Sequence, residues 1–362
     1  KKVLPSTAAV SNPVDVIGDA QHDRYEKALE IVARDSNVDM VLVIITPQAM
    51  TDVKEIAEVI ARFDSATDIP VIASFMGIVD VSPGVKILEE SEVPHYRFPE
   101  EAARSLSAMH KYTRWISRPR TQVKSFPVDV KAVEEELSLA RSRNQKVLLI
   151  DQSMKILKHY GFPLLPFDTA RNQEEAIQKA KIIGFPVAMK ILSQEAVHKV
   201  DVGGVRLDIK NEEELAGAYS SMVKSLASHA AGASIEGVFL QAMAGKGREV
   251  ILGMNRDPHF GPVLMFGLGG IYVEALKDVT FRLAPVRELG AYNMITAIRT
   301  YSILKGIRGQ ARADLLAIAE CIQRLSQLSC EHDKIREIDI NPLLVYPEKQ
   351  GACVLDARIV ID

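Results

Sequence analysis

Apolar runs alternate with amphipathic stretches along the first 115 residues of the chain. Positions 38–46 and 69–75 are apolar almost throughout, which is typical of strands buried on both faces of a sheet. The intervening segment 52–63 places Val53 and Ile56 on one helical face. Shorter segments of the same kind follow, with a helix expected at 85–90, a strand at 95–98 and a helix at 99–115. Repeated strand–helix units predict an α/β domain with an open parallel sheet and helices on both of its faces.

The pattern changes after this first domain. The segment 111–124 carries five basic residues and no acidic residue, and a helix is expected at 131–143. We therefore expect the domain boundary within 116–145. Beyond it the expected elements are helices at 152–160, 173–183 and 212–228, strands at 185–191 and 205–209, mostly strand from 238 to 285, helices at 287–304 and 310–329, and a hairpin with strands at 335–345 and 352–361.

The C-terminal hairpin places polar side chains on one face. Alternate residues of a strand share a face, so Glu337, Asp339 and Asn341 point the same way. A turn centred on 348–349 pairs Asn341 with Asp356, with their Cβ atoms about 5 Å apart. Mg²⁺ is commonly held by one or two such oxygen ligands, and waters and phosphates complete its shell. The spacing predicts a metal site at Asn341 and Asp356, whereas solvent exposure alone is the simpler explanation for Glu337.

A lysine and a histidine flank a paired-glycine segment. Lys190 ends an apolar strand, so its ammonium must meet water, a carboxylate or a phosphate. Simple extension of the side chain into solvent is the alternative. The pair Gly203-Gly204 permits positive φ angles and a backbone cradle for phosphate. His198 lies close to this pair in sequence, and histidine can carry a phosphoryl group as a nucleophile.

Two further polar residues border apolar strands. Gln241 closes one strand, and Glu249 begins the next. Each could accept a hydrogen bond from a ribose hydroxyl or from the edge of an adenine. Each could equally be an ordinary residue at a strand end.

A loop in the first domain is a candidate anion site. Gln48, Ala49, Met50 and Thr51 follow a buried strand and precede a helix. Thr51 is the expected N-cap, and the N-terminus of a helix attracts anions. Ordinary turn chemistry explains the same residues equally well.

Length, charge and cysteine usage narrow the function classes. At about 150 residues per domain, 362 residues correspond to two or three domains. Lys and Arg number 44 and Asp and Glu 47, which argues against a general nucleic-acid binder. No apolar run approaches the roughly 20 residues of a membrane span. The three cysteines show no metal-ligand spacing, so we expect a reducing, cytoplasmic setting.

Several segments together carry a resemblance to a known family. They are GFPVAMK (184–190), HKVDVGGV (198–205), LQAMAGKGREVILG (240–253), RDPHFGPVLMFGLGG (256–270) and EIDINPLLV (337–345), with Asp356. This set resembles the ATP-grasp half of NDP-forming acyl-CoA synthetases, which are the ADP-forming acetyl-CoA synthetases and their relative succinyl-CoA synthetase. Residues 1–115, with SNPVDVIGD and VIITPQAMTD, resemble the flavodoxin-like ligase-CoA domain of the same family.

The resemblance implies an organisation and a reaction. It implies a flavodoxin-like domain at 1–115, a linker with a helix at 116–145, and an ATP-grasp domain at 146–362, with lobes at about 146–236 and 237–362. The implied reaction converts acyl-CoA, phosphate and ADP into acid, CoA and ATP through a phosphohistidine. The implied cofactors are Mg²⁺ and ATP or ADP.

The resemblance also implies roles for single residues. Lys190 would contact nucleotide phosphates, Gln241 would lie at the adenine hinge, and Glu249 would hold the ribose. Asn341 and Asp356 would hold Mg²⁺, in agreement with the hairpin register.

Three further sites would serve the phosphoryl group. Asp339 matches a carboxylate that steadies the incoming phosphohistidine. His198 matches a histidine proposed as a second phosphoryl carrier beside the nucleotide. The loop at 48–51 would lie near the transferred phosphoryl group.

The chain departs from the family pattern in what it does not contain. We find no CoA-binding domain and no second flavodoxin-like domain with the primary phosphohistidine, and the chain begins with Lys1 rather than Met. We expect these modules on a missing N-terminal portion or a separate subunit, in an oligomer acting on a small acid or acyl-CoA.

Two other function classes are open. One is a nucleotide- or acyl-CoA-sensing regulatory module without turnover, as in protein acetyltransferase fusions. The other is a different ATP-grasp carboxylate ligase, against which the ligase-like first domain argues. The joint presence of Lys190, His198, Asn341 and Asp356 favours the enzyme, because a sensor need not keep metal ligands and a phosphorylatable histidine.

Overall fold

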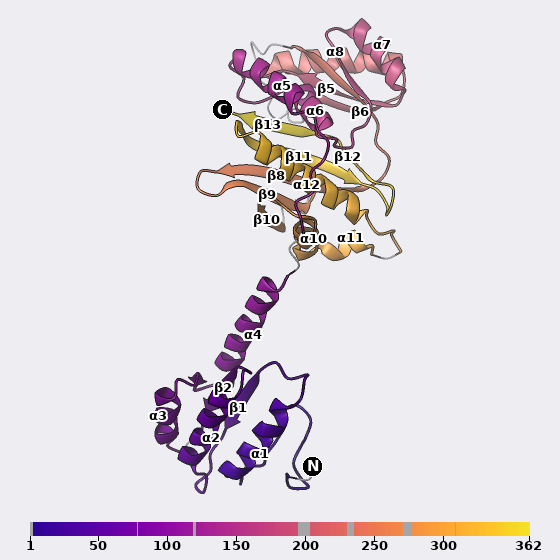
Figure 1. Ribbon diagram of the computed structural model, residues 1–362. Helices are drawn as coiled ribbons and strands as arrows, with labels where there is room; N and C mark the ends of the chain where they lie inside the picture. The colour runs from indigo at the N-terminus through magenta and orange to yellow at the C-terminus, as the bar shows by residue number, and fades with distance from the viewer. Residues whose placement is uncertain are drawn as a thin grey trace. The chain divides into compact units, whose positions relative to one another are not determined.

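The computed structural model describes residues 3–77, 79–118, 121–194, 203–229, 235–270, 277–307 and 309–362. The chain divides into two compact units, Lys1–Arg120 (unit 1) and Thr121–Asp362 (unit 2). Figure 1 shows the helices and strands of each unit.

Unit 1 is built on a small parallel sheet. Its strands are β1 (Val41–Ile45), β2 (Val71–Phe75) and β3 (His95–Tyr96), hydrogen-bonded in that order. Its helices are α1 (His22–Ala33), α2 (Val53–Ala66), α3 (Ser82–Glu90) and α4 (Pro99–Ile116). Val53 and Ile56 are buried against the strands, as the helical periodicity predicted. The parallel sheet confirms the α/β class predicted for this part of the chain.

In unit 1, one helix was not predicted and one predicted helix cap is wrong. The sequence patterns did not single out α1, of which only Leu29 is fully buried. Asp52, rather than Thr51, is the N-cap of α2, because its carboxylate accepts the backbone N–H groups of Lys54 and Glu55. A carboxylate at this position also interacts favourably with the positive end of the helix dipole.

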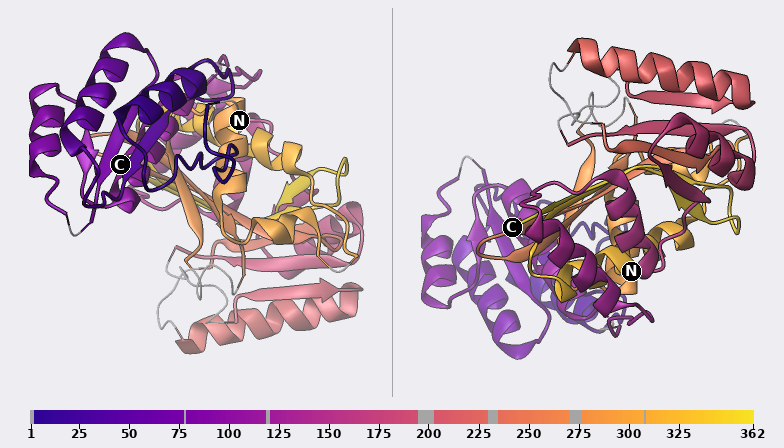
Figure 2. Two further views of the ribbon diagram at one scale, coloured as in Figure 1. Left: turned by 90° about the horizontal axis from the view of Figure 1, so that it is seen from below. Right: turned by 90° about the horizontal axis from the view of Figure 1, so that it is seen from above.

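The first sheet of unit 2 has four antiparallel strands. They are β4 (Phe167–Ala170), β7 (Gly237–Ala242), β5 (Val187–Leu192) and β6 (Val205–Ile209), in that order across the sheet. Helices α7 (Gln173–Ile183) and α8 (Glu212–His229) pack on this sheet and share its apolar core (Figure 2).

The second sheet of unit 2 has six strands. Four run in the order β10 (Val279–Leu283), β9 (Gly261–Leu268), β8 (Arg248–Asp257) and β11 (Ile335–Val345), and both β12 (Ala352–Val354) and β13 (Ala357–Ile361) pair with β11. The associated helices are α5 (Val130–Ser142), α6 (Ile150–His159), α10 (Glu288–Ala297), α11 (Tyr301–Lys305) and α12 (Leu315–Glu331). Side chains of all five helices join the sheet in one buried cluster, to which α11 contributes Leu304. Two sheets with helices outside them match the two-lobed fold that the resemblance implied.

The helices after β10 are shorter than predicted. Instead of one helix at 287–304, the chain forms α10 and α11, separated at 298–300. Asp278 causes this break, because its carboxylate accepts the backbone N–H groups of Arg299 and Thr300 and the Thr300 hydroxyl, at 2.6–2.9 Å. The next helix begins at Leu315, where Asp314 caps it through the Ala317 N–H.

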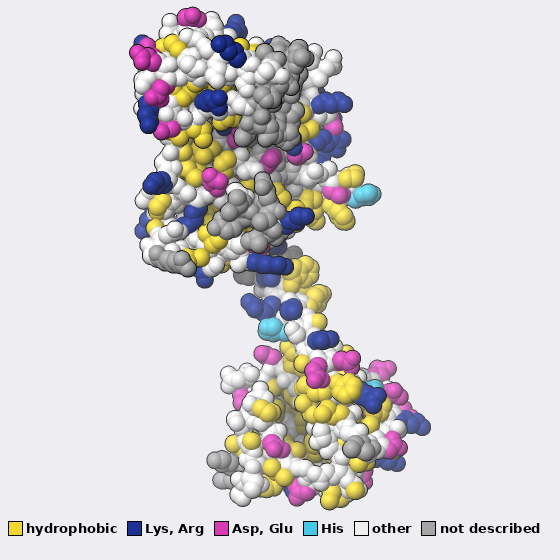
Figure 3. All heavy atoms as spheres, turned by 180° about the vertical axis from the view of Figure 1, so that it is seen from behind, with side chains coloured by type: hydrophobic (Ala, Val, Ile, Leu, Met, Phe, Trp, Pro, Cys, Tyr) yellow, Lys and Arg dark blue, Asp and Glu magenta, His cyan; other side chains and the backbone are white. Residues whose placement is uncertain are grey.

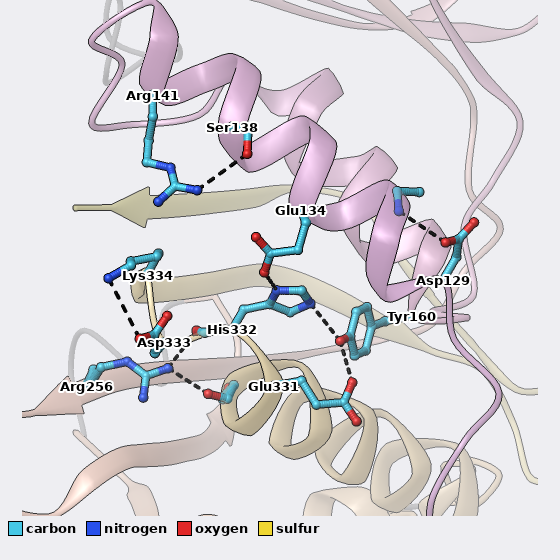
Figure 4. Close-up of polar contacts among 12 residues, drawn as sticks. Asp129, Glu134, Ser138, Arg141, Tyr160, Arg256, Glu331, His332, Asp333 and Lys334 are labelled. Atoms are coloured by element: carbon cyan, nitrogen blue, oxygen red, sulfur yellow. Dashed lines mark hydrogen bonds and ion pairs between the residues drawn. The ribbon is translucent and has the colours of Figure 1, made fainter.

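A buried polar network joins α5, the helix expected in the linker, to the rest of unit 2 (Figure 4). The His332 side chain is fully buried at the end of α12, and its Nδ1 lies 2.8 Å from Glu134 of α5. Its Nε2 lies 2.8 Å from the hydroxyl of Tyr160, which donates to Glu331 at 2.6 Å. Arg256 of β8 donates to the carbonyls of Ser329 and His332. Helix α5 is therefore held to the rest of unit 2 by specific polar contacts as well as by its apolar face.

The exterior carries both signs of charge. Figure 3 shows acidic and basic side chains interspersed over the visible face of each unit, in keeping with the formal net charge of −3. None of the helices in the described part of the chain combines the length and the apolar character needed to span a membrane.

Candidate functional site

Lys190 reaches from one sheet of unit 2 to the other. It lies on β5, and its side chain is only 8% exposed. Its ammonium donates to the carbonyl of Leu355 at 2.6 Å and lies 3.4 Å from the Asp356 carboxylate. The ring of Phe239 lies below it, 5.9 Å from the ammonium to the ring centroid. Leu355 and Asp356 connect β12 to β13, so this lysine marks the place where the two sheets meet.

Gln241 makes a second contact between the same two sheets. It is buried on β7, next to β5, and its side-chain amide donates to the carbonyl of Val354 at 3.3 Å. Lys190 and Gln241 therefore donate to the carbonyls of consecutive residues, Leu355 and Val354, where β12 ends and the connection to β13 begins. The structure thus brings Lys190 and Gln241, two of the predicted nucleotide-binding residues, to the segment 354–356, which contains the predicted metal ligand Asp356.

The hairpin register confirms the predicted pairing of Asn341 with Asp356. Leu343 pairs with Val354 and Ile340 with Ala357, on either side of the two candidate ligands. The backbone N–H of Asn341 donates to the carbonyl of Asp356 at 3.1 Å. Asn341 is exposed and the Asp356 side chain is 36% exposed, so both oxygens are accessible to an ion.

Carboxylates gather on this face of the sheet. Burial raises the pKa of Asp339, and although Arg358 opposes this, the charges of Glu337 and Asp356 raise it further. Arg358 donates to Glu337 at 2.5 Å. A cation bound beside Asp356 would relieve the mutual repulsion of these carboxylates.

The donor set fits Mg²⁺ held jointly with phosphates. Within the described ranges no three His, Cys, Asp or Glu side chains are close enough to form a metal cage. One carboxylate from Asp356 and one amide oxygen from Asn341 suit an ion that keeps waters and binds nucleotide phosphates. The ammonium of Lys190, 3.4 Å from Asp356, lies where it could share those phosphates.

The glycine pair lies beside Lys190. The backbone N–H of Ile191 donates to the carbonyl of Gly204 at 2.9 Å, and Lys190 pairs with Val205. Gly203 has φ +64°, and a Cβ there would lie 3.0 Å from Ser225 Oγ, so this position favours glycine. The neighbouring candidate His198 lies outside the described residues.

Glu249 is not part of the Lys190–Asp356 contacts. Glu249 is exposed at the start of β8, and its backbone carbonyl accepts the Gly269 N–H at 2.8 Å. Across the β8–β11 ladder, Glu249 lies opposite Leu344. Leu344 in turn pairs with Cys353, so Glu249 lies two strands from the segment that Gln241 contacts.

The loop at 48–51 belongs to unit 1. The Thr51 hydroxyl accepts the Gln48 N–H at 3.0 Å, and the Gln21 amide donates to the Met50 carbonyl at 2.9 Å. Gln48, Ala49 and Met50 are exposed at the carboxyl end of β1, where ligands of open parallel sheets bind.

Sequence reasoning missed two parts of the site. Phe239 lies below the Lys190 ammonium and stacks on Phe167, with the ring centroids 5.3 Å apart. The carbonyls of Val354 and Leu355 hold the two polar side chains. An aromatic residue two positions before Gln241 was the available signal for Phe239, but a backbone carbonyl leaves no signature in the sequence.

The fold and these contacts define the chain as an ATP-grasp protein. The ATP-grasp domain family matches residues 139–361, and the Ligase-CoA domain family matches residues 1–119. The chain belongs to the ADP-forming acyl-CoA ligase family.

Three relatives illustrate the similarity. The 4-hydroxybutyrate–CoA ligase [ADP-forming] of Nitrosopumilus maritimus is 37% identical over 99% of this chain and 51% of its own length. The acetate–CoA ligase [ADP-forming] I subunit beta of Pyrococcus furiosus is 43% identical over 64% of this chain and 99% of its own length. A solved acetyl-coenzyme A synthetase 1 of Ca. Korarchaeum cryptofilum, bound to coenzyme A and Ca-AMPCP, has a TM-score of 0.62 and 39% identity over 63% of this chain and 99% of its own. The chain thus spans about half the length of the longer relative and all but 1% of the separate beta subunit.

Proposed function

We propose that this chain is the nucleotide-binding and phosphoryl-transfer portion of an ADP-forming acyl-CoA synthetase. The complete reaction would convert acyl-CoA, phosphate and ADP into acid, CoA and ATP. The observation that carries the proposal is the convergence of Lys190 and Gln241 on the segment that contains Asp356. It supplies a cation for phosphates, an amide for a base, and a carboxylate for a metal ion in one place.

The chain's own residues would divide the work as follows. The Lys190 ammonium would exchange its present partners for phosphate oxygens of the nucleotide. Gln241 and the neighbouring backbone would orient the adenine. Asn341 and Asp356 would hold Mg²⁺, which when bound neutralises phosphate charge.

The phosphoryl step rests on two further residues. In the ATP-forming direction the P–N bond of a phosphohistidine breaks, and a P–O bond forms to the terminal phosphate oxygen of ADP. Asp339 would orient the imidazole by accepting its free N–H, and the released ring nitrogen would take up a proton. His198 is the proposed carrier beside the nucleotide. In unit 1, the exposed loop at 48–51 would bind a phosphoryl group at a helix N-terminus.

The remaining modules would come from outside this chain. A relative that matches unit 2 is a separate beta subunit, and a longer relative has about as much chain again. We propose that CoA binding and the primary phosphohistidine lie on such a partner or additional portion, in an oligomer. The described cysteines form no disulfide, which is compatible with a reducing, cytoplasmic location.

Calorimetric titration with Mg·ADP tests the nucleotide site. We expect saturable binding to the wild type and at least tenfold weaker binding to Lys190→Met, because a charge-assisted contact to phosphate contributes about 1.5–3 kcal/mol. Lys210→Met is the matched control and should bind as the wild type does, because Lys210 is an exposed lysine just after β6 of the same sheet. Equal affinities for the Lys190 and Lys210 variants would contradict the assignment.

Labelling separates the enzyme from a sensing module. With Mg²⁺ and γ-labelled ATP, the wild type should acquire acid-labile, base-stable phosphate, and His198→Ala should lose it. If both proteins are labelled equally, His198 is not the carrier. If the wild type binds Mg·ADP but is never labelled, the sensing alternative replaces the enzyme.

A further inference from the structure

A pocket lies at the beginning of β4, the strand next to the one that carries Gln241. It encloses about 510 Å³ between the end of α6, the beginning of β4 and the end of α7. Seven of its lining residues are apolar, namely Phe162, Leu164, Leu165, Pro166, Phe167, Ile182 and Ile183. Its volume and its mainly apolar walls are typical of sites for small molecules.

One wall of this pocket is in direct contact with the residues that hold Gln241. The Val354 N–H donates to the Pro163 carbonyl at 2.9 Å, and Leu164 forms a parallel bridge with Val354. Phe167 pairs with Gln241 across β4 and β7. The segment 163–167 therefore borders this pocket and also contacts Val354 and Gln241, the residues of the proposed adenine hinge.

Two lysines line the pocket, Lys158 and Lys179, and the ammonium of Lys179 is already paired with carboxylates. The ammonium of Lys179 already donates to the Thr169 carbonyl and lies 3.2 Å from Asp168 and 2.8 Å from Glu175. Lys158 also lines the pocket and is exposed, and in the part of the chain that the structure describes its ammonium has no ion-pair partner. A ligand with one negative charge would complement Lys158.

An exposed aliphatic side chain adds to the apolar surface at the pocket. Ile182 is 84% exposed although it lines the pocket. Covering such a side chain with an apolar ligand removes hydrocarbon surface from water, which is favourable. The chemistry of the pocket is thus that of an apolar body combined with one anionic group.

We propose that this pocket binds a small carboxylate with an aliphatic or aromatic body, with the carboxylate on Lys158 and the body against Leu164, Leu165 and Phe167. A bound ligand packs on segment 163–167 in the arrangement that holds Val354 and Gln241. It therefore favours that arrangement and tightens nucleotide binding. The binding claim is independent of the proposed function, and only the coupling to nucleotide rests on it.

Titration of the whole chain with octanoate, in the absence of nucleotide, tests the binding site. We expect saturable binding that Lys158→Gln weakens about fivefold, the effect of one solvent-exposed charge pair. Leu165→Trp, which fills the pocket, should abolish binding, whereas Lys155→Gln on the same helix should leave it unchanged. Octan-1-ol should bind the wild type and Lys158→Gln equally. Absence of saturable octanoate binding, or equal octanoate binding by Lys158→Gln and the wild type, would overturn the proposal.

A second titration tests the coupling. Saturating octanoate should lower the dissociation constant for Mg·ADP, and by linkage Mg·ADP should tighten octanoate by the same factor. An unchanged Mg·ADP affinity refutes the coupling. If Mg·ADP does not bind at all, the proposed function fails, and the octanoate titration still decides whether the pocket is a binding site.

Discussion

Replacing Tyr160 by Phe removes one hydroxyl from the interior of unit 2 and leaves the ring in place. The Tyr160 side chain is completely buried. Its hydroxyl donates to Glu331 at 2.6 Å and, because it has a single proton, accepts a hydrogen bond from His332 Nε2 at 2.8 Å. Burial raises the pKa of Tyr160 far above its usual range, so the hydroxyl remains a donor at all ordinary pH values.

The magnitude follows from these two contacts. A hydrogen bond to a charged group contributes about 1.5–3 kcal/mol, and a buried group left without a partner costs about 1–3 kcal/mol. Because Glu331 can turn to water but the buried His332 cannot, we expect a loss of about 2–4 kcal/mol in the free energy of unfolding of unit 2. For a unit of this size the melting temperature should fall by roughly 4–12 °C.

Thermal unfolding measures this effect. The single tryptophan, Trp115, lies in unit 1, so its fluorescence follows that unit, whereas far-UV circular dichroism follows both. The transition seen only by circular dichroism belongs to unit 2 and should move in Tyr160→Phe. Tyr219→Phe, whose hydroxyl makes only a 3.5 Å contact at the surface of unit 2, is the control. Equal shifts in the two variants would refute the proposed importance of the network.

Four other substitutions test local features of the fold. Asp278→Asn should destabilise unit 2 by about 1–2 kcal/mol at neutral pH. Partial burial raises the pKa of Asp278, but hydrogen bonds from Thr300 and Arg299 lower it more, so the net pKa lies below its usual value. The stabilisation by Asp278 is therefore present above the unfolded-state pKa and is lost as the pH falls through the folded-state pKa. Thermal unfolding of the wild type and Asp278→Asn across pH checks this. A difference in stability between the two proteins that does not change with pH would contradict it. Gly237→Ala should cost about 2–4 kcal/mol, since φ is +146° and a Cβ would lie 2.3 Å from the Ala170 carbonyl. Gly217→Ala should instead stabilise unit 2 by about 0.5–1 kcal/mol, because an added Cβ inside α8 meets nothing within 4 Å. Urea unfolding measures both glycine variants, and a change of the same sign in their free energies of unfolding would contradict these two predictions. Asp52→Ala should cost unit 1 about 1 kcal/mol through the lost helix cap, measured by Trp115 fluorescence, and an unchanged midpoint would show that the cap is unimportant.

The hairpin register was predictable because two local signals determine it. Alternating polarity assigned a face to each residue of β11, and a short turn fixed which residues lie opposite one another. Asn341 and Asp356 could therefore be paired from the sequence alone. The same period-two pattern also placed Glu337 and Asp339 on their side.

The contacts of Lys190 and Gln241 were beyond local reasoning. Lys190 meets the Leu355 carbonyl 165 residues further along the chain, and Gln241 meets Val354 113 residues away. Hydrophobic periodicity says nothing about which two sheets face each other over such separations. Only the resemblance to a family suggested that these residues act together.

Short or interrupted elements were missed for physical reasons. Strand β4 has four residues, two of them polar, so no period-two pattern can develop. The predicted helix at 287–304 has helical composition throughout, but Asp278 takes the backbone donors of Arg299 and Thr300. A side chain some twenty residues earlier in the chain thus overrides local propensity.

The central claim is that Asp356 and Asn341 hold a metal ion that the nucleotide shares, next to Lys190. The most direct measurement is the affinity for ADP with and without Mg²⁺ in the wild type, Asp356→Ala and the control Asp333→Ala, whose side chain is 81% exposed near the start of β11. We expect Mg²⁺ to tighten ADP binding in the wild type and in Asp333→Ala. In Asp356→Ala that gain should fall at least tenfold, corresponding to about 1.4 kcal/mol. An equal gain from Mg²⁺ in all three proteins would contradict the account.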